Sequence, residues 1–496
     1  MPSNDLNFTI SNGGLANAQP DVSKRIIFAG CSSSGTASVV AAVSDIATLK
    51  SLYGNGPLTE AAADWIDATG YPAYVYKIPT NTSGAAGSVT HTGTGTTVMT
   101  VSGNSADAYQ VVINVTTGGT VGTSGIVVQY SLDNGNSGLG PNDAKYPLGT
   151  ATTLVLYDGT LATGLTLSMT HAGSDTMVAG DQYYFVATAP IWATSAVDGT
   201  SSSLAAYLLT SSVDFGGIQL LGAVDGTDAA AINASMEPAL FNAYEYAFIA
   251  VEARDGNSGE SESTWMGSII SDFAAVNSDR LLGAGGYGNY ASKLSTKIAR
   301  RSVNWPMVVR AGQVSNGVDL ARVKDGALRN FTLTNPSGPI ANIMHDERNV
   351  PGLNAARFVC ARSLKGKSGA YLYNANIMCA PGSDYSLMQY RRVMDAACRA
   401  TRDNMQMQLS NDVRLDPKTG YILEKDARTG ETKLRLAIKS ATVDTGDASD
   451  CTAAWSRIDN ISSTKALHCT VGVEPLGYLK TIYVTLGFYN PALSAS

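Results

Sequence analysis

Long apolar runs are absent from this chain of 496 residues, and no stretch approaches the roughly 18 residues that a membrane helix needs. The first ten residues, MPSNDLNFTI, lack the basic and apolar regions of a signal peptide, so we expect a protein that is made and kept in a cytoplasm, with no integral membrane segment. Charged residues make up only 15% of the chain and apolar residues 44%, which is typical of a globular protein. The length predicts about three domains.

Residues that bind metals or perform catalysis are scarce. The six cysteines stand far apart without a CxxC pair, so we expect buried free thiols and neither a zinc site nor disulfides. The four histidines show no spacing for a catalytic triad or for a metal pair. The sequence therefore predicts no catalytic residue, no metal and no cofactor, and we do not expect an enzyme.

Three short motifs suggest enzymes, and each fails in its context. GCSSSGT, residues 30–36, follows an expected strand as a phosphate loop would, but it lacks the lysine that reaches the phosphates. GAGGYG, residues 283–288, fits the glycine pattern of a dinucleotide-binding turn, yet the first acidic residue after it is Asp319, too far along to hold a ribose. In MHDERN, residues 344–349, adjacent side chains point in different directions, so we interpret it as a charged surface turn.

Charge is divided unevenly along the chain. Residues 1–279 carry 6 basic and 24 acidic side chains, whereas residues 280–496 carry 28 basic and 17 acidic ones. Opposite charges on two parts of one subunit favour head-to-tail contacts between copies, or a basic surface against an acidic partner. We do not expect a nucleic-acid partner, because the basic half lacks dense Lys/Arg clusters interleaved with aromatic residues.

Residues 21–79 alternate between strand and helix patterns, with KRIIFAG and YPAYVYKI as strands and VSDIATLKSLYG and LTEAAADWIDATG as helices. The alternation resumes after Asp198, which predicts a mostly parallel sheet covered by helices, built from residues 21–81 and 199–345. The segment between these parts, residues 82–198, is rich in Thr and Gly, and its alternating pieces such as YQVVINV predict an all-β sandwich or barrel. The isolated aspartates of its turns lack the spacing of a calcium loop.

A C-terminal domain is expected over residues 346–477, with a long helix from about Ser386 to Leu409 that Asp384 caps. The apolar stripe of this helix is expected to be buried: Leu387, Tyr390, Met394, Ala397, Thr401 and Met405. Its other faces carry four arginines: Arg391, Arg392, Arg399 and Arg402. The predicted fold class is α+β multidomain, a split α/β domain that carries an inserted all-β module, plus an α+β C-terminal domain.

Both ends of the chain carry a short strand pattern on a loose tether. TIYVTLGFYN, residues 481–490, alternates without a break, and its apolar side is Ile482, Val484, Leu486 and Phe488. LNFTI does the same with Leu6, Phe8 and Ile10. Such strands need partners for their backbone groups, which they find either in their own domain or in the sheet of a neighbouring subunit.

Four segments, in this order, resemble the sheath proteins of contractile phage tails and related injection machines. The first is LYGNGPLTEAAADWIDATGYPAYVYKI, residues 52–78, where a Gly-Pro-Leu turn leads into a helix, a glycine and a strand. GSDYSLMQYRRVMDAA, residues 382–397, is similar to the Arg-Val-Met helix of that family. DPKTGYILEKDARTGE, residues 416–431, and VGVEPLGYLKTIYVTLGFYNP, residues 471–491, resemble its late hairpin and closing strand. Residues 82–198 do not share the resemblance.

The resemblance implies six-fold discs that stack as a helical tube around an inner tail tube, with baseplate and tail terminator proteins as further partners. It implies that the N-terminal arm, residues 1–20, and the C-terminal arm, residues 478–496, join neighbouring subunits as exchanged strands. The protein would then lie in a virion tail, after assembly in the host cytoplasm, and the β module would lie on the outside. We expect the four arginines either to face an acidic tube or to form ion pairs within their own domain.

Two other functions stay open from the sequence. One is a non-contractile tail or surface protein that polymerises through the same arms and has no second, shorter state. The other is a protein that binds or cleaves glycans through the β module, which would require carboxylates converging in a cleft.

Overall fold

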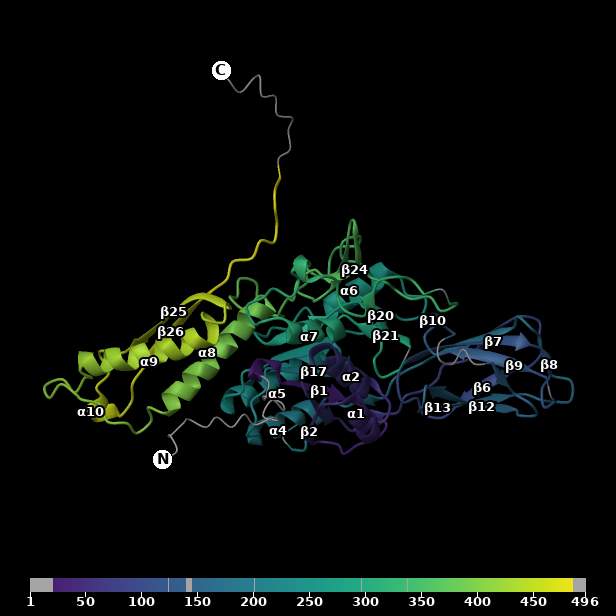
Figure 1. The fold of residues 1–496 in the computed structure, drawn as a ribbon, viewed down its shortest axis with the longest axis horizontal. Helices are drawn as coiled ribbons and strands as arrows, with labels where there is room; N and C mark the ends of the chain where they lie inside the picture. The colour runs from purple at the N-terminus through teal and green to yellow at the C-terminus, as the bar shows by residue number, and fades with distance from the viewer. Residues whose placement is uncertain are drawn as a thin grey trace, which may run out of the picture. The chain divides into compact units, whose positions relative to one another are not determined.

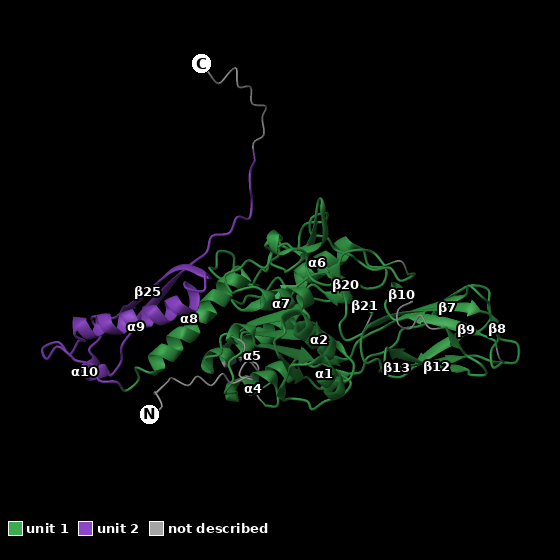
Figure 2. Ribbon diagram, in the orientation of Figure 1, with its two compact units in different colours: residues 1–410 green, residues 411–496 purple. Residues whose placement is uncertain are grey.

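A computed structural model describes residues 21–123, 125–139, 145–199, 201–295, 297–336 and 338–484. The chain divides into two compact units at Ser410, and each is described separately (Figure 2). Unit 1 ends there, and unit 2 begins at Asn411. No helix among the described residues combines the length and the apolar character that a membrane crossing requires.

A six-stranded sheet forms the centre of unit 1 (Figure 1). Its strands lie in the order β2 (Val40–Val43), β3 (Ala73–Lys77), β1 (Ile26–Gly30), β17 (Gly217–Ala223), β18 (Phe248–Glu252) and β19 (Leu281–Ala284). All neighbours are parallel except β2, which runs antiparallel to β3. Side chains alternate between two cores, so that Ile26 and Phe28 face one and Ile27 and Ala29 the other. The mostly parallel sheet predicted from the sequence is present.

Helices cover both faces of this sheet, as the predicted α/β pattern requires. The helices that pack in the core of Phe28 are α1 (Ile46–Tyr53), α2 (Pro57–Thr69) and α7 (Asn304–Gln313). Those in the core of Ile27 are α3 (Ser195–Asp198), α4 (Leu204–Thr210), α5 (Gly226–Asn242) and α6 (Glu262–Asp272). Local sequence sets the ends of α2, because Pro57 occupies its first turn and Gly70 ends it in the left-handed conformation.

The segment from β4 (Thr80–Thr82) to β16 (Ile191–Trp192), which precedes α3 and α4, forms sheets with a core of their own. Five strands lie in the order β11 (Tyr146–Pro147), β9 (Val127–Ser131), β7 (Tyr109–Thr117), β15 (Gln182–Ala187) and β5 (Thr90–Thr92). Three more lie in the order β12 (Thr153–Asp158), β13 (Leu161–Met169) and β6 (Met99–Ser102). The shorter strands are β4 with β16, β8 (Gly119–Thr120) with β14 (Thr176–Met177), and β10 (Asn136–Leu139).

Buried charges join this β-rich segment to the rest of unit 1. The Lys297 ammonium lies 2.8 Å from an Asp107 oxygen and 3.0 Å from an Asp158 oxygen, and 3.5 Å from Glu60 of α2. Arg301 contacts both Glu60 and Asp107. Burial raises the pKa of Asp107, but the two cations outweigh burial and lower it to about 2. Three carboxylates from distant segments therefore share two buried cations.

The remainder of unit 1 consists of short strands and one long helix. The strands are β20 (Tyr287–Ala291), β21 (Ile298–Ser302), β22 (Phe331–Thr332), β23 (Ala361–Leu364) and β24 (Lys367–Leu372). Two 3-10 turns, Val22–Lys24 and Val323–Asp325, complete the unit. The long helix is α8 (Met388–Gln406). The predicted cap is wrong, because Leu387 occupies the cap position and no side chain, including that of Asp384, bonds the first turn.

Unit 2 packs one helix on a two-stranded hairpin. The elements are α9 (Glu424–Thr442), β25 (Ala448–Trp455), α10 (Ile461–Thr464) and β26 (Cys469–Pro475). β25 and β26 are antiparallel, with Cys451 opposite Val473. Helix α9 buries Ala427, Leu434 and Ile438. The boundaries predicted for the domains stay predictions.

One packing contact in unit 2 yields a stability prediction. A Cβ atom at Gly430 of α9 would overlap the Trp455 ring. Alanine favours a helix by about 1 kcal/mol over glycine, but overpacking costs about 1–3 kcal/mol. We therefore expect Gly430→Ala to lower the thermal stability of unit 2, measured by circular dichroism. Lys433→Ala, at an exposed position of the same helix, is the control, and equal melting curves for both variants would contradict the packing argument.

Candidate assembly surfaces

The C-terminal arm starts where β26 ends, at Pro475. In its described part, residues 476–484, no strand is formed. The side chains of Ile482 and Val484 are 72% and 70% exposed, and Leu479 and Tyr483 are exposed too. The other predicted arm residues lie outside the described residues: Leu6, Phe8, Ile10, Leu486 and Phe488. Two members of the predicted apolar stripe are thus in water in the isolated subunit.

The hairpin that precedes this arm has two open edges. Among the described strands, β25 pairs only with β26, and β26 only with β25. Each strand therefore presents one row of backbone N–H and C=O groups away from the ladder. A two-stranded hairpin is only marginally stable, and additional strands would complete the sheet over α9. Either open edge, that of β25 or that of β26, can accept an extended segment by backbone pairing.

The arginines of α8 lie differently from the sequence-based expectation. Arg391, Arg392 and Arg399 are buried. The sequence placed them on the faces of the helix that lie outside its apolar stripe. Arg392 donates to the backbone oxygen of Ala311 at 2.8 Å, and Arg399 to that of Tyr246 at 2.6 Å. The apolar stripe was predicted only in part, since Ala397 is buried but Met394 and Tyr390 are half-buried.

Arg391 and Arg402 form ion pairs inside unit 1. The Arg391 Nε atom lies 2.8 Å from Asp395, one turn along α8, and Arg402 pairs with Asp214. Ion pairs within the predicted C-terminal domain, the alternative that the sequence left open, describe only the contact of Arg391 with Asp395, because Asp214 lies outside residues 346–477. A contact of the four arginines with an inner tube stays a prediction, and the three buried guanidinium groups are poorly placed for it.

The interpretation of MHDERN as a charged surface turn is confirmed only in part: Arg348 and Asn349 lie exposed in a turn, but His345 and Glu347 are buried. His345 is 1% exposed and Glu347 is 3% exposed. The His345 ring nitrogens lie 2.8 Å from Glu262 and 3.0 Å from Glu347. His345 and Glu347 are two residues apart, and side chains two apart point to the same side of an extended segment, so the rule about adjacent residues does not keep these two from meeting.

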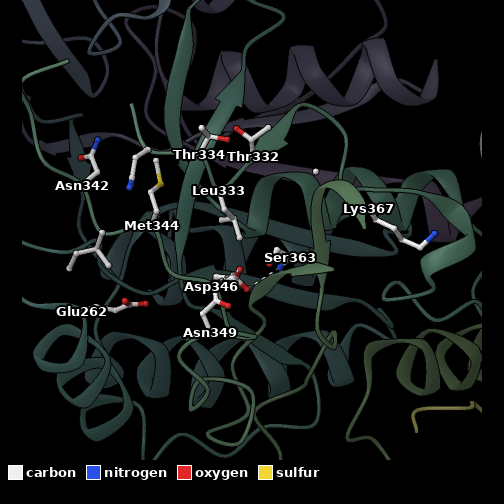
Figure 3. Close-up of a pocket in the computed structure, with 13 residues that line it drawn as sticks. Glu262, Thr332, Leu333, Thr334, Asn342, Met344, Asp346, Asn349, Ser363 and Lys367 are labelled. Carbon is white, nitrogen blue, oxygen red and sulfur yellow. Dashed lines mark hydrogen bonds between the residues drawn. The ribbon is translucent and has the colours of Figure 1, made fainter. Parts of the chain in front are cut away.

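Glu262, a partner of this histidine, and Asp346, its neighbour in the chain, line a polar cavity of about 620 Å³ (Figure 3). Asp346 accepts a hydrogen bond of 2.9 Å from the Ser363 backbone N–H in its wall. Hydroxyl, amide and carboxylate side chains dominate the lining: Glu262, Thr332, Thr334, Asn342, Asp346, Asn349 and Ser363. Aromatic residues do not line the cavity, so the described wall offers no stacking surface for a nucleotide or a sugar ring.

The glycine motif at residues 283–288 connects two strands and not a strand and a helix. Gly283 belongs to β19 and Gly288 to β20. A Cβ at Gly288 would overlap the Phe331 ring or approach Thr332, so this glycine serves close packing. A dinucleotide turn requires a helix N-terminus at this point. Among the described residues, no group of three His, Cys, Asp or Glu side chains could hold a metal ion.

The chain matches the DUF2586 family over residues 3–376, for its N-terminal domain, and 384–493, for its C-terminal domain. No curated protein matches the sequence. Among solved structures, it is similar to a chain of the anti-feeding prophage baseplate, with 8% identity and a TM-score of 0.49 over 99% of this chain and 100% of that chain. A sheath tail protein from Desulfitobacterium hafniense has 12% identity and a TM-score of 0.42, over 95% and 100% of the two chains. A sheath tail protein from Listeria innocua has 10% identity and a TM-score of 0.41, over 92% and 96%.

The two family matches follow each other along the chain with a gap of only residues 377–383, and they include both predicted arms in large part. On these matches, the chain belongs to the DUF2586 family.

Proposed function

We propose that this protein is the subunit of a contractile tail sheath, which polymerises by donating terminal strands to its neighbours. The observation that carries the proposal is an exposed apolar arm that directly follows an open hairpin. Ile482 and Val484 are in water in the isolated subunit, and each strand of the β25–β26 hairpin has a free edge among the described strands. A donated strand would bury its apolar side chains and would pair its backbone groups with the unpaired groups of the open edge.

The magnitudes suit a lasting connection between subunits. Burial of two side chains such as Ile482 and Val484 contributes on the order of 3–6 kcal/mol. Each backbone hydrogen bond adds about 1 kcal/mol net, and ordering the arm subtracts part of the gain. Because donor and acceptor surfaces differ, the contact is head-to-tail and generates rings or open helices. The proposed assembly is a stack of six-fold discs around an inner tail tube.

Contraction would use the arms as hinges. Residues 476–480, LGYLK, follow β26 without regular structure, so a donated arm can stay paired while the bodies rotate. Changes in the contacts between bodies would then supply the energy, and the acidic and basic parts of the chain favour such contacts. On this proposal the partners are an inner tube, a baseplate and a tail terminator, and the assembly works without catalysis.

The experiment compares the full-length protein with a chain that ends at Gly477, by negative-stain electron microscopy. We expect hollow tubes from the full-length protein and no tubes from the shortened one, because the strand that links neighbours is gone. Monomers from both proteins would contradict the proposal. A non-contractile polymer would also form tubes, but it would lack a second state that is shorter and wider.

A matched pair of substitutions distinguishes strand donation, which depends on one side of the strand, from any effect of an added charge in the arm. Ile482→Asp places a charge on the apolar side of the strand pattern, whereas Thr481→Asp places the same charge on its other side. We expect tubes from Thr481→Asp and none from Ile482→Asp. Equal assembly of the two variants would show that the alternating pattern does not set the contact.

A further inference from the structure

The His345 imidazole is held between two carboxylates in the interior of unit 1. Its Nδ1 lies 2.8 Å from an oxygen of Glu262, on α6, and its Nε2 lies 3.0 Å from an oxygen of Glu347. The ring of Trp265, one turn along α6, packs beside it with centroids 5.7 Å apart. Gly286, in the turn between β19 and β20, approaches the ring from another element. Both ring nitrogens are thus fully engaged.

The number of protons decides whether both contacts can form. A neutral imidazole has one N–H group and one lone pair, and an ionised carboxylate only accepts. Two ionised partners therefore need two N–H groups, which only the imidazolium provides. Burial raises the pKa of Glu347, but the hydrogen bonds from His345 and from the backbone N–H groups of Gly352 and Asn354 outweigh it and lower the pKa. Glu347 is therefore ionised and accepts a hydrogen bond from one N–H group of the ring.

The two carboxylates are held with very different strength. Glu347 also accepts hydrogen bonds from the backbone N–H groups of Gly352 at 2.8 Å, Leu353 at 3.1 Å and Asn354 at 3.0 Å. Glu262 is 31% exposed and lines the polar cavity, where water can reach it (Figure 3). If the ring keeps only one proton, the better-held Glu347 retains it and Glu262 loses its donor.

We propose that His345 is a protonation-dependent clasp that fastens α6 to the loop of residues 345–354. The clasp is closed while the imidazolium donates to both Glu262 and Glu347. Loss of one proton opens it at Glu262, whose carboxylate is then free in the cavity beside Asp346. The proposal does not depend on the proposed sheath function, because it concerns a contact inside one subunit.

The other charged groups around the ring favour the closed form. Asp346 adds a third carboxylate near the ring, and burial raises its pKa, but the hydrogen bonds from Ser363 and Arg348 outweigh burial and lower it. Cations also lie on or beside this segment. Arg300 of β21 donates to the Ile343 backbone oxygen at 2.6 Å and pairs with Asp255. Arg348 is exposed, and Arg362 of β23 lies over the Tyr373 ring. The Cys360 thiol beside Glu347 stays neutral, because burial raises its pKa well above the usual value.

Glu262→Gln tests the clasp without removing the histidine. The amide can accept from an N–H group or donate to a lone pair, so it bonds the neutral ring as well as the imidazolium. The wild-type clasp needs the second proton, so its stabilising contribution falls as pH rises, and that fall should vanish in Glu262→Gln. Between pH 5.5 and 8.5 we expect the melting temperature of the wild type to drop by roughly 2–4 °C more than that of the variant. Glu237→Gln, on α5, is the control and should keep the wild-type profile.

Nitrogen NMR of the full-length protein, with only histidine labelled, reads the proton directly. The chain has four histidines, so removal of His91, His171 and His468 one at a time assigns the His345 signal. We expect a second protonated ring nitrogen in the wild type wherever the clasp is closed, lost over the same pH interval in which the stability of the wild type falls relative to Glu262→Gln. A neutral His345 ring in the wild type, or pH profiles that coincide for wild type and Glu262→Gln, would overturn the proposal.

Discussion

Replacement of Lys297 by methionine is expected to destabilise unit 1 by about 3–5 kcal/mol, because it leaves buried carboxylates without their cation. Lys297 is 4% exposed and contacts Asp107, Asp158 and Glu60, which are exposed by 2% or less. Its ammonium also lies 4.8 Å from the centre of the Tyr109 ring. By the size of the unit, the loss corresponds to a melting temperature lower by roughly 4–6 °C. Differential scanning calorimetry of the full-length protein measures it.

The control is a lysine of the same region whose ion pair is exposed. Lys293 is 38% exposed and lies 3.6 Å from Asp67, so Lys293→Met should cost less than about 1 kcal/mol. If the two variants melt within 1 °C of each other, burial does not set the strength of the Lys297 contacts.

The loss of stability at acid pH tests the contacts of Lys297 and Arg301 with Asp107 independently. The pKa of Asp107 is about 2 in the folded protein, below its ordinary value of 3.8, because Arg301 and Lys297 outweigh the effect of burial. A depressed pKa stabilises the fold above the unfolded value, and the contribution is lost as pH falls from about 4 toward 2. In Lys297→Met the pKa of Asp107 rises, so the acid loss begins at higher pH.

The regular elements of unit 1 could be predicted because their signals are local. The alternation in KRIIFAG and the proline and glycine that bound LTEAAADWIDATG lie within single elements, and both elements are present as β1 and α2. The parallel sheet follows from the repetition of this pattern. Its strand order does not, since β1 pairs with β17 across the whole β-rich segment.

The polar interior could not be predicted, because its partners are distant in sequence. Arg280 meets Asp395 across 115 residues, and Lys297 meets Asp107 across 190. A helical pattern assigns an arginine to the surface unless such a partner is known, and this is why Arg392 and Arg399 were misplaced: their backbone partners, Ala311 and Tyr246, lie 81 and 153 residues away. His345 shows that a near partner can be missed too, because Glu347 is only two residues away and contacts its ring. A buried histidine between carboxylates carries no spacing that a motif search would find.

Of the two candidate assembly surfaces, the sequence indicated the C-terminal arm but not the open hairpin edge. The alternating stretch from Thr481 predicted a strand in need of a partner, and its described beginning is exposed. The edge that would receive such a strand was not visible, because β25 reads as an ordinary mixed segment, ASDCTAAW. Its pairing with β26 alone became clear only in three dimensions.

Asp395→Asn is expected to destabilise unit 1 by on the order of 3 kcal/mol, since it leaves two buried guanidinium groups without a carboxylate. Asp395 is 2% exposed and accepts from Arg280 Nη1 at 3.1 Å and from Arg391 Nε at 2.8 Å. Burial lowers the pKa of Arg391, but Asp395 outweighs burial and raises it, so the guanidinium stays charged. Four of the five tryptophans lie in unit 1, so urea unfolding followed by tryptophan fluorescence reports the change.

Asp403→Asn is the matched control, on the same helix and beside another arginine. Asp403 is 61% exposed, and its partner Arg402 also pairs with Asp214, so the substitution should cost less than about 1 kcal/mol. A loss for Asp395→Asn as small as that of the control would mean that Arg280 and Arg391 are satisfied by backbone oxygens and water. In that case α8 would be free to expose its arginines, and their contact with an acidic inner tube would regain support. A large difference instead fixes α8 as an internal helix of unit 1, and places any contact with a tube on other residues.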